Sequence, residues 1–203
     1  PKGEQHTATV IFMHGLGDSG YGWAPVSEQL QMPWIKFMFP TAPAQPVSLN
    51  MGMEMPAWFD IYSLDPEDKK EDVEGMLESA KYVSDLIEKE IQKGIPPNRI
   101  VLGGFSQGGA IAYATSLMLS ETPLAGVLCL STWIPRFVRS RRAHTAAGLK
   151  QDFLVCHGDS DMVVQYDWGR QSFEKLVSEG AKAEFKTYRG MGHSLCGEEL
   201  QGL

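Results

Sequence analysis

A serine lies at the centre of a glycine-flanked segment, Gly-Phe-Ser-Gln-Gly at residues 104–108. The segment follows the apolar run of residues 99–103 and precedes a helical pattern. A serine hydroxyl is a weak nucleophile, and a sharp strand-to-helix turn lifts it to where a base can reach it. Gly104 and Gly108 leave room for such a turn. We therefore expect Ser106 to be a nucleophile, the alternative being that it only caps the following helix.

Two later segments supply an acid and a base for this nucleophile. His193 ends a Gly-Met-Gly-His loop, and imidazole is suited to proton transfer near neutral pH. The alternative is that His193 is a surface histidine without a role. Asp159 and Asp161 both follow a strand-like run, and we favour Asp161 because an aspartate directly after a glycine commonly caps its own turn. The chain order Ser, Asp, His is that of α/β-hydrolases and differs from the chymotrypsin and subtilisin orders.

A glycine-containing loop, His-Gly-Leu-Gly-Asp at residues 14–18, follows the first predicted strand. Such a loop is similar to the segment of lipases and esterases whose backbone amide faces the developing alkoxide. We expect the amides of Leu16 and Gln107 to form the oxyanion hole, with His14 bracing the loop. A glycine turn without chemistry is the alternative.

Met51, Met53 and Met55 alternate along a stretch that ends at Pro56. Methionine adapts to irregular apolar space and suits a flexible channel for an acyl chain, although core filling explains the pattern equally well. Trp133 follows the predicted strand of residues 125–131 and either lines the same pocket or packs in the core.

These candidates must be positioned by a regular alternation of strands and helices. Strands are predicted at residues 7–13, 35–39, 99–103, 125–131, 153–157 and 184–188, and helices at residues 23–31, 72–93, 106–119 and 166–179. The alternation implies an α/β-hydrolase fold with a mostly parallel central sheet, helices on both faces and no large lid domain. The carboxyl ends of parallel strands share one edge, so the candidates should converge there. We expect one domain over residues 1–203, with a final helix that is short or truncated.

Composition excludes several other classes. The 203 residues are 43% hydrophobic and 21% charged, as in ordinary globular proteins, and the formal net charge of −7 argues against nucleic-acid binding. Neither a membrane span nor a signal peptide is visible. Cys129, Cys156 and Cys196 are widely spaced, which favours reduced thiols and a cytoplasmic protein.

The remaining patterns point to no metal and no organic cofactor, because neither zinc-ligand spacing nor a phosphate-binding loop occurs. Four arginines fall within residues 136–142 of this acidic chain. A solvated loop is the simpler explanation, with contact to anionic lipid headgroups as the alternative. The charged residues 65–72 are expected to face solvent.

Taken together, the chain resembles the cytosolic acyl-protein thioesterases, also called small lysophospholipases or carboxylesterases. The resemblance rests on segments that follow one another in order over nearly the whole chain, at residues 12–20, 40–43, 49–60, 94–109, 130–135, 156–161 and 185–194. The chain departs from the family at Met162 and Val163, where proline is usual, and in residues 136–142.

The resemblance implies a triad of Ser106, Asp161 and His193, with oxyanion donors as above and an acyl channel beside the methionines and Trp133. It implies removal of long acyl groups from cysteine thioesters of lipidated proteins, in the cytoplasm or transiently at membranes. A lysophospholipase or short-chain carboxylesterase is the alternative activity, and a non-catalytic ligand-binding scaffold is a further one. The oligomeric state is not determined by the sequence.

Overall fold

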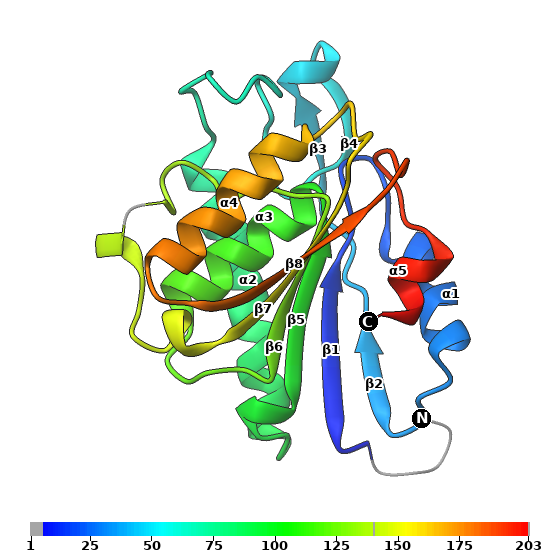
Figure 1. Ribbon diagram of the computed structural model, residues 1–203. Helices are drawn as coiled ribbons and strands as arrows, with labels where there is room; N and C mark the ends of the chain where they lie inside the picture. The colour runs from blue at the N-terminus through cyan, green and yellow to red at the C-terminus, as the bar shows by residue number, and fades with distance from the viewer. Residues whose placement is uncertain (1–5, 140, 203) are drawn as a thin grey trace.

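A six-stranded sheet in the order β2-β1-β5-β6-β7-β8 forms the centre of the molecule, and all its neighbouring strands are parallel. This computed structural model describes residues 6–139 and 141–202 (Figure 1). The six strands are β1 Ala8–Met13, β2 Ile35–Met38, β5 Ile100–Phe105, β6 Gly126–Leu130, β7 Asp152–Gly158 and β8 Lys182–Tyr188. A separate antiparallel pair consists of β3 Ala44–Val47 and β4 Met53–Pro56.

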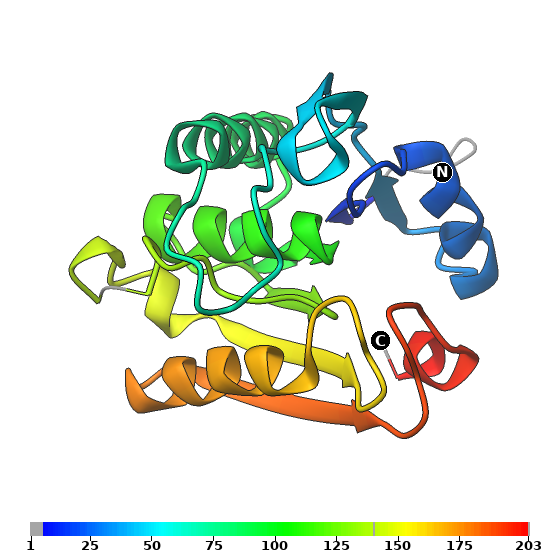
Figure 2. The ribbon, with the colours of Figure 1, turned by 90° about the horizontal axis from the view of Figure 1, so that it is seen from above.

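Helices cover both faces of the large sheet. The helices are α1 Gly20–Leu30, α2 Val73–Gln92, α3 Gln107–Ala114, α4 Tyr166–Ser178 and α5 Gly197–Gln201. Figures 1 and 2 show α2, α3 and α4 on one face, and α1 and α5 on the other. The predicted α/β-hydrolase fold is confirmed, and no large lid domain is present within the described residues. None of the described helices is long and apolar enough to span a bilayer.

The sheet separates two apolar cores because alternate side chains of a strand point to opposite faces. In β1, Ile11 and Met13 join the core beneath α2, α3 and α4, whereas Phe12 joins the smaller core beneath α1 and α5. In β6, Cys129 and Leu130 divide in the same way. Both faces are therefore occupied by packing, which leaves the ends of the strands for a site.

Helix α2 illustrates why the predicted helices form. Asp72 caps its first turn by accepting a hydrogen bond from the Gly75 amide at 3.0 Å. Met76, Ala80 and Val83 recur at helical spacing and are buried against the sheet. One amphipathic face thus fixes the orientation of the helix.

The structure differs from the predicted elements in two places. Residues 44–56, for which no strand is predicted, form the β3–β4 hairpin, whose turn places Met51 and Gly52 at positive φ. The helix predicted at residues 106–119 is an α-helix only to Ala114 and ends in a π turn, Thr115–Leu119. Short 3-10 turns lie at Ser48–Asn50, Pro97–Arg99, Arg141–Ala143 and Gly148–Lys150.

Candidate active site

Ser106 lies on the sharp turn between β5 and α3. Its backbone has φ 53° and ψ −120°, a conformation that L-residues rarely adopt. The turn needs its glycines, since a Cβ on Gly104 would lie 2.3 Å from the Gly108 backbone. The end of β6 braces it: the Ser106 amide donates to the Leu130 carbonyl at 2.9 Å, and the Thr132 hydroxyl donates to the Ser106 carbonyl at 2.7 Å. The predicted strand-turn-helix is therefore present.

His193 and Asp161 come together from the loops after β8 and β7. The Nδ1 atom of His193 lies 2.7 Å from Oδ2 of Asp161. A carboxylate only accepts, so Nδ1 carries the proton and Nε2 is left without one in the neutral ring. The His193 ring lies 4.7 Å from the ring of Phe105, the residue before Ser106. The imidazole is therefore positioned beside the nucleophile turn.

Both carboxylate oxygens of Asp161 accept hydrogen bonds. The amides of Val163 and Val164 each donate to Oδ1 at 2.9 Å. Burial alone would raise the pKa of this carboxyl, but hydrogen bonds from His157 and His193 hold it well below its usual range. Asp161 is thus a fixed anion that can orient an imidazole and stabilise an imidazolium.

Asp159, the alternative acid, has a different role. Its Oδ1 accepts from the Gly190 amide at 2.7 Å and from the Ser160 hydroxyl at 3.1 Å. These bonds tie the turn after β7 to the loop that leads to His193. Asp159 therefore does not cap its own turn, as considered from the sequence, but binds the backbone of a neighbouring loop.

The loop after β1 lies against Ser106. A Cβ on Gly15 would be 3.5 Å from the Cβ of Ser106. Within residues 6–139 and 141–202, the Leu16 amide donates to no protein acceptor, and Gln107 is the first residue of α3, where amides have no intrahelical partner. Both amides thus remain available to a ligand.

Two buried side chains brace this loop. His14 accepts from the Ala42 amide through Nε2 at 3.0 Å, so its Nδ1 carries the proton and donates to the Gly15 carbonyl at 2.6 Å. Burial lowers the pKa of His14, which favours this neutral ring. The Gln107 side chain accepts from the Trp58 amide and donates to the Phe59 carbonyl, at 2.9 and 2.7 Å. No pattern in the sequence predicts these Gln107 bonds.

The four residues predicted to border an acyl channel are not brought around one cavity. Met51 and Met53 lie on the hairpin and are 94% and 60% exposed. Met55 is half-buried beside Gly17 of the loop after β1. Trp133 is buried and stacks on Trp168 with ring centroids 4.7 Å apart.

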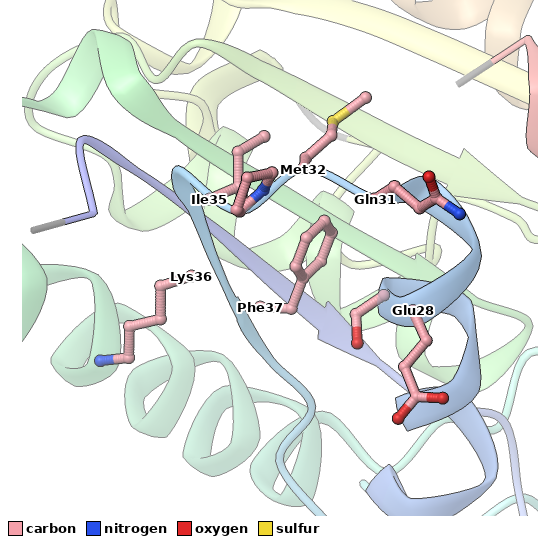
Figure 3. A pocket seen from close by; sticks show the side chains of 8 residues that line it. Glu28, Gln31, Met32, Ile35, Lys36 and Phe37 are labelled. Carbon is pink, nitrogen blue, oxygen red and sulfur yellow. The ribbon is translucent and has the colours of Figure 1, made fainter. Parts of the chain in front are cut away.

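Two cavities of the structure contain none of the three methionines in their linings. A cavity of only about 30 Å³ adjoins Trp133 and the segment of residues 59–71. A groove of about 640 Å³ separates the end of α1 from β2, and Figure 3 shows its lining side chains, Glu28, Gln31, Met32, Ile35, Lys36 and Phe37 among them. Neither is lined by Ser106, Asp161 or His193.

The arginine-rich segment is bonded rather than freely solvated. The Arg136 amide donates to Glu71 at 2.7 Å, and its guanidinium donates to the Asp68 carbonyl at 3.2 Å. Arg139 donates to the Ile134 carbonyl at 3.2 Å. The expectation that these charged runs are simply solvent-facing is therefore wrong for Glu71, Arg136 and Arg139. Ser140 and the Arg141 side chain lie outside the described residues.

Known proteins of similar sequence agree with this geometry. The chain matches the model of the protein family described as Phospholipase/Carboxylesterase over residues 1–203. It is 47% identical over 225 aligned positions to acyl-protein thioesterase 1 of Cryptococcus neoformans var. neoformans serotype D, covering 100% of this chain and 92% of that protein.

Solved structures show the same similarity. The crystal structure of Arabidopsis thaliana SOBER1 superposes with a TM-score of 0.90 at 32% identity, over 96% of this chain and 94% of that one. Zea mays acyl-protein thioesterase 2 gives a TM-score of 0.86 at 33% identity, over 98% of this chain and 92% of that one.

Proposed function

Because this chain belongs to the phospholipase/carboxylesterase family, we propose that it is a serine hydrolase that cleaves long-chain acyl thioesters from S-acylated proteins. The observation that supports it best is the 2.7 Å bond between His193 and the fixed Asp161 carboxylate, next to the strained Ser106 turn. The similarity to an acyl-protein thioesterase supports the choice of substrate.

In the proposed mechanism, Nε2 of His193 takes the Ser106 proton as the hydroxyl oxygen attacks the acyl carbonyl. A tetrahedral intermediate forms and then collapses, the sulfur takes that proton and leaves as a thiol, and an acyl-enzyme remains. A water molecule, deprotonated by the same imidazole, then releases the fatty acid. Asp161 stabilises the imidazolium in both half-reactions without taking the proton itself.

The amides of Leu16 and Gln107 are the proposed oxyanion donors. They flank Ser106 from two elements, the loop after β1 and the start of α3, and neither donates to a protein acceptor in the part of the chain that the structure describes. The bonds of His14 and of the Gln107 side chain fix these amides before substrate arrives. Such preorganised donors typically supply about 3–4 kcal/mol of transition-state stabilisation.

The acyl chain is proposed to lie along Met51, Met53 and Met55 and to enter beside Trp133 only after that region opens. A cavity of about 30 Å³ is far below the roughly 300–1,000 Å³ of typical ligand pockets. The exposed methionines provide apolar surface along which a chain leaving a bilayer could bind. Exposed Tyr21 and Met162 would extend this surface in transient membrane contact.

A lysophospholipase activity is the second candidate, and the family description favours it. A lysophospholipid presents the same long acyl chain, but on an oxygen ester. We place either activity in the cytoplasm, consistent with the free thiols of Cys129, Cys156 and Cys196.

The deciding experiment compares hydrolysis of a palmitoyl-cysteine peptide, its palmitoyl-serine counterpart and lysophosphatidylcholine, with Ser106→Ala as the control variant. We expect rapid thioester cleavage that falls by at least about 10³-fold in Ser106→Ala. Cleavage of the lysolipid alone would assign the protein to lipid metabolism. Activity that persists in the variant would remove Ser106 as the nucleophile.

A further inference from the structure

We infer that His157 is a positioning residue for the proposed reaction, acting through Asp161. It is fully buried at the end of β7, and its Nε2 lies 2.9 Å from the Val164 carbonyl and 3.5 Å from Oδ2 of Asp161. That oxygen is the one that His193 contacts at 2.7 Å. The inference rests on the proposed triad and adds a fourth residue behind it.

The tautomer of His157 follows from its partners. A backbone carbonyl only accepts, so Nε2 must carry a proton. Nδ1 is buried and has no hydrogen-bond partner among the described residues, as expected of a ring nitrogen without a proton. The ring therefore presents one N–H to two acceptors on the loop that follows β7.

The N–H of His157 lies close to both Asp161 and the Val164 carbonyl, so it connects two parts of the loop that carries the acid. Asp161 receives two amide N–H groups on Oδ1 and the His193 N–H on Oδ2, and Nε2 of His157 lies 3.5 Å from that same Oδ2. With donors on both oxygens, the carboxylate has one favoured rotamer, and its Oδ2 faces His193. Without His157, rotation of the carboxylate would meet less resistance on the Oδ2 side.

The surroundings fix the His157 ring. A Cβ on Gly169 of α4 would lie only 2.2 Å from its Nδ1, so α4 packs directly on the imidazole. Tyr166 meets it edge-on with ring centroids 6.0 Å apart. Besides Asp161, His193 and Tyr166, the charge that influences this pocket is that of Glu199, whose interaction with His157 acts across the sheet. Among the described residues, neither Tyr166 nor Glu199 accepts a hydrogen bond from Nε2, so its acceptors are the Val164 carbonyl and, at 3.5 Å, Oδ2 of Asp161.

The test uses three variants. His157→Leu removes the N–H with little change in volume, His157→Gln can return an N–H near the Nε2 position, and Gly169→Ala pushes the unchanged imidazole from its place. His144→Leu is the matched control, because His144 is another buried histidine that bonds a backbone carbonyl, that of Val138 at 2.6 Å, away from the site. Activity is measured on p-nitrophenyl butyrate as well as on a palmitoyl-cysteine peptide, below each variant's unfolding temperature.

We expect His157→Leu to lower kcat about tenfold, with KM changed less than twofold, as for loss of one weak bond to a charged group. His157→Gln should recover most of the loss, Gly169→Ala should reproduce it, and His144→Leu should leave kcat unchanged. The downfield proton resonance of the His193 Nδ1–H should broaden in His157→Leu and in Gly169→Ala, but not in His144→Leu. If His157→Leu does not fold, Gly169→Ala and His157→Gln still decide the matter.

Wild-type kcat and an unaltered His193 resonance in the folded variants would overturn the inference. So would equal losses in His157→Leu and His157→Gln, since these would show that the N–H is irrelevant. A wild-type protein that hydrolyses neither substrate would instead contradict the proposed function. Hydrolysis of the butyrate ester without hydrolysis of the palmitoyl-cysteine peptide would contradict only the proposed acyl substrate.

Discussion

Ser106 occupies a backbone conformation that only its neighbours make tolerable. A non-glycine residue at φ 53° and ψ −120° is disfavoured by of order 1–3 kcal/mol, and two bonds from the end of β6 hold it there. The motif predicted the serine, the turn and the need for glycines. It could not predict Thr132, because that contact depends on how β6 pairs with β5. His157 was missed for the same reason: no spacing in the sequence shows which side chain lies behind Asp161.

A second residue, Glu199, should make stability depend on pH. Glu199 lies on α5, and its carboxyl is fully buried, with the Cys196 backbone to offset that burial in part. Burial raises the pKa of Glu199 from 4.5 to about 7. The native state therefore retains a proton that the unfolded chain loses, so this favourable contribution is complete below pH 4.5 and is lost as the pH rises through 7.

We expect Glu199→Gln to raise the free energy of unfolding by about 2–3 kcal/mol at pH 8 and to change it little at pH 4.5. Glutamine stays neutral at both values, whereas the native glutamate must ionise at the higher one. Urea unfolding at the two pH values measures the difference. An equal effect at both would show that ionisation of Glu199 is not the cause.

At the scale of elements, one buried carboxylate ties α2 to the sheet. Glu90 is fully buried and bonds Lys36 of β2 at 2.7 Å, Thr9 of β1 at 3.0 Å and Lys93 at 2.9 Å. Burial acts to raise the pKa of Glu90, but these bonds lower it to about 2. A lowered pKa means that the stabilisation is present above pH 4.5 and is lost as the pH falls towards 2.

Glu90→Gln should therefore lower the free energy of unfolding by about 3 kcal/mol at pH 7, and the difference from wild type should shrink near pH 2.5. Denaturant unfolding at both pH values is the measurement. Asp85→Asn on the same helix is the control, because it removes only an exposed pair with Lys81 and should cost less than about 0.5 kcal/mol. Equal effects of the two variants would contradict this view of α2.

The β3–β4 hairpin bears on the choice of substrate. We expect the double change of Met51→Ser and Met53→Ser to lower kcat/KM for a palmitoyl thioester about tenfold and to leave that for a butyryl ester nearly unchanged, since a buried methylene contributes about 0.8 kcal/mol. Val177→Ser, on exposed surface of α4, is the control. A series of acyl lengths gives the measurement, and parallel losses at all lengths would argue against a role for the hairpin in binding the chain.

The order of the main strands and helices could be predicted because their hydrophobic periods are regular, as in α2 with Met76, Ala80 and Val83. The hairpin could not. Pro46 lies within β3 and Pro56 ends β4, and proline ordinarily indicates a loop. Its strands pair only with each other, so local propensity gave no signal for a structure that depends on one turn.

For the molecule as a whole, the thiols should report on global unfolding. Cys129 and Cys156 are buried in the centre of the sheet, and burial raises the pKa of Cys156 to about 12 and that of Cys129 further. Cys196 is half-buried outside the sheet. Only a thiolate reacts readily, so the two sheet thiols should be inert in the native state.

With iodoacetamide at pH 8, we expect Cys196 to react first and Cys129 and Cys156 to react only as fast as the protein unfolds. Peptide mass spectrometry over a time course gives the three rates, and a denatured sample gives the fully reactive reference. If Cys129 reacted as fast as Cys196, the sheet would open locally far more often than its packing implies.

The order of the strands also bears on how the protein is made. Ser106 follows the central strand β5, whereas His193 follows β8, which is both the last strand in the chain and an edge of the sheet. During synthesis the turn that carries Ser106 can form well before His193 has been made. A ribosome-bound chain would then carry Ser106 without its proposed base, and the proposed activity would begin only when β8 adds to β7. The onset of hydrolysis would therefore measure when β8 joins the sheet.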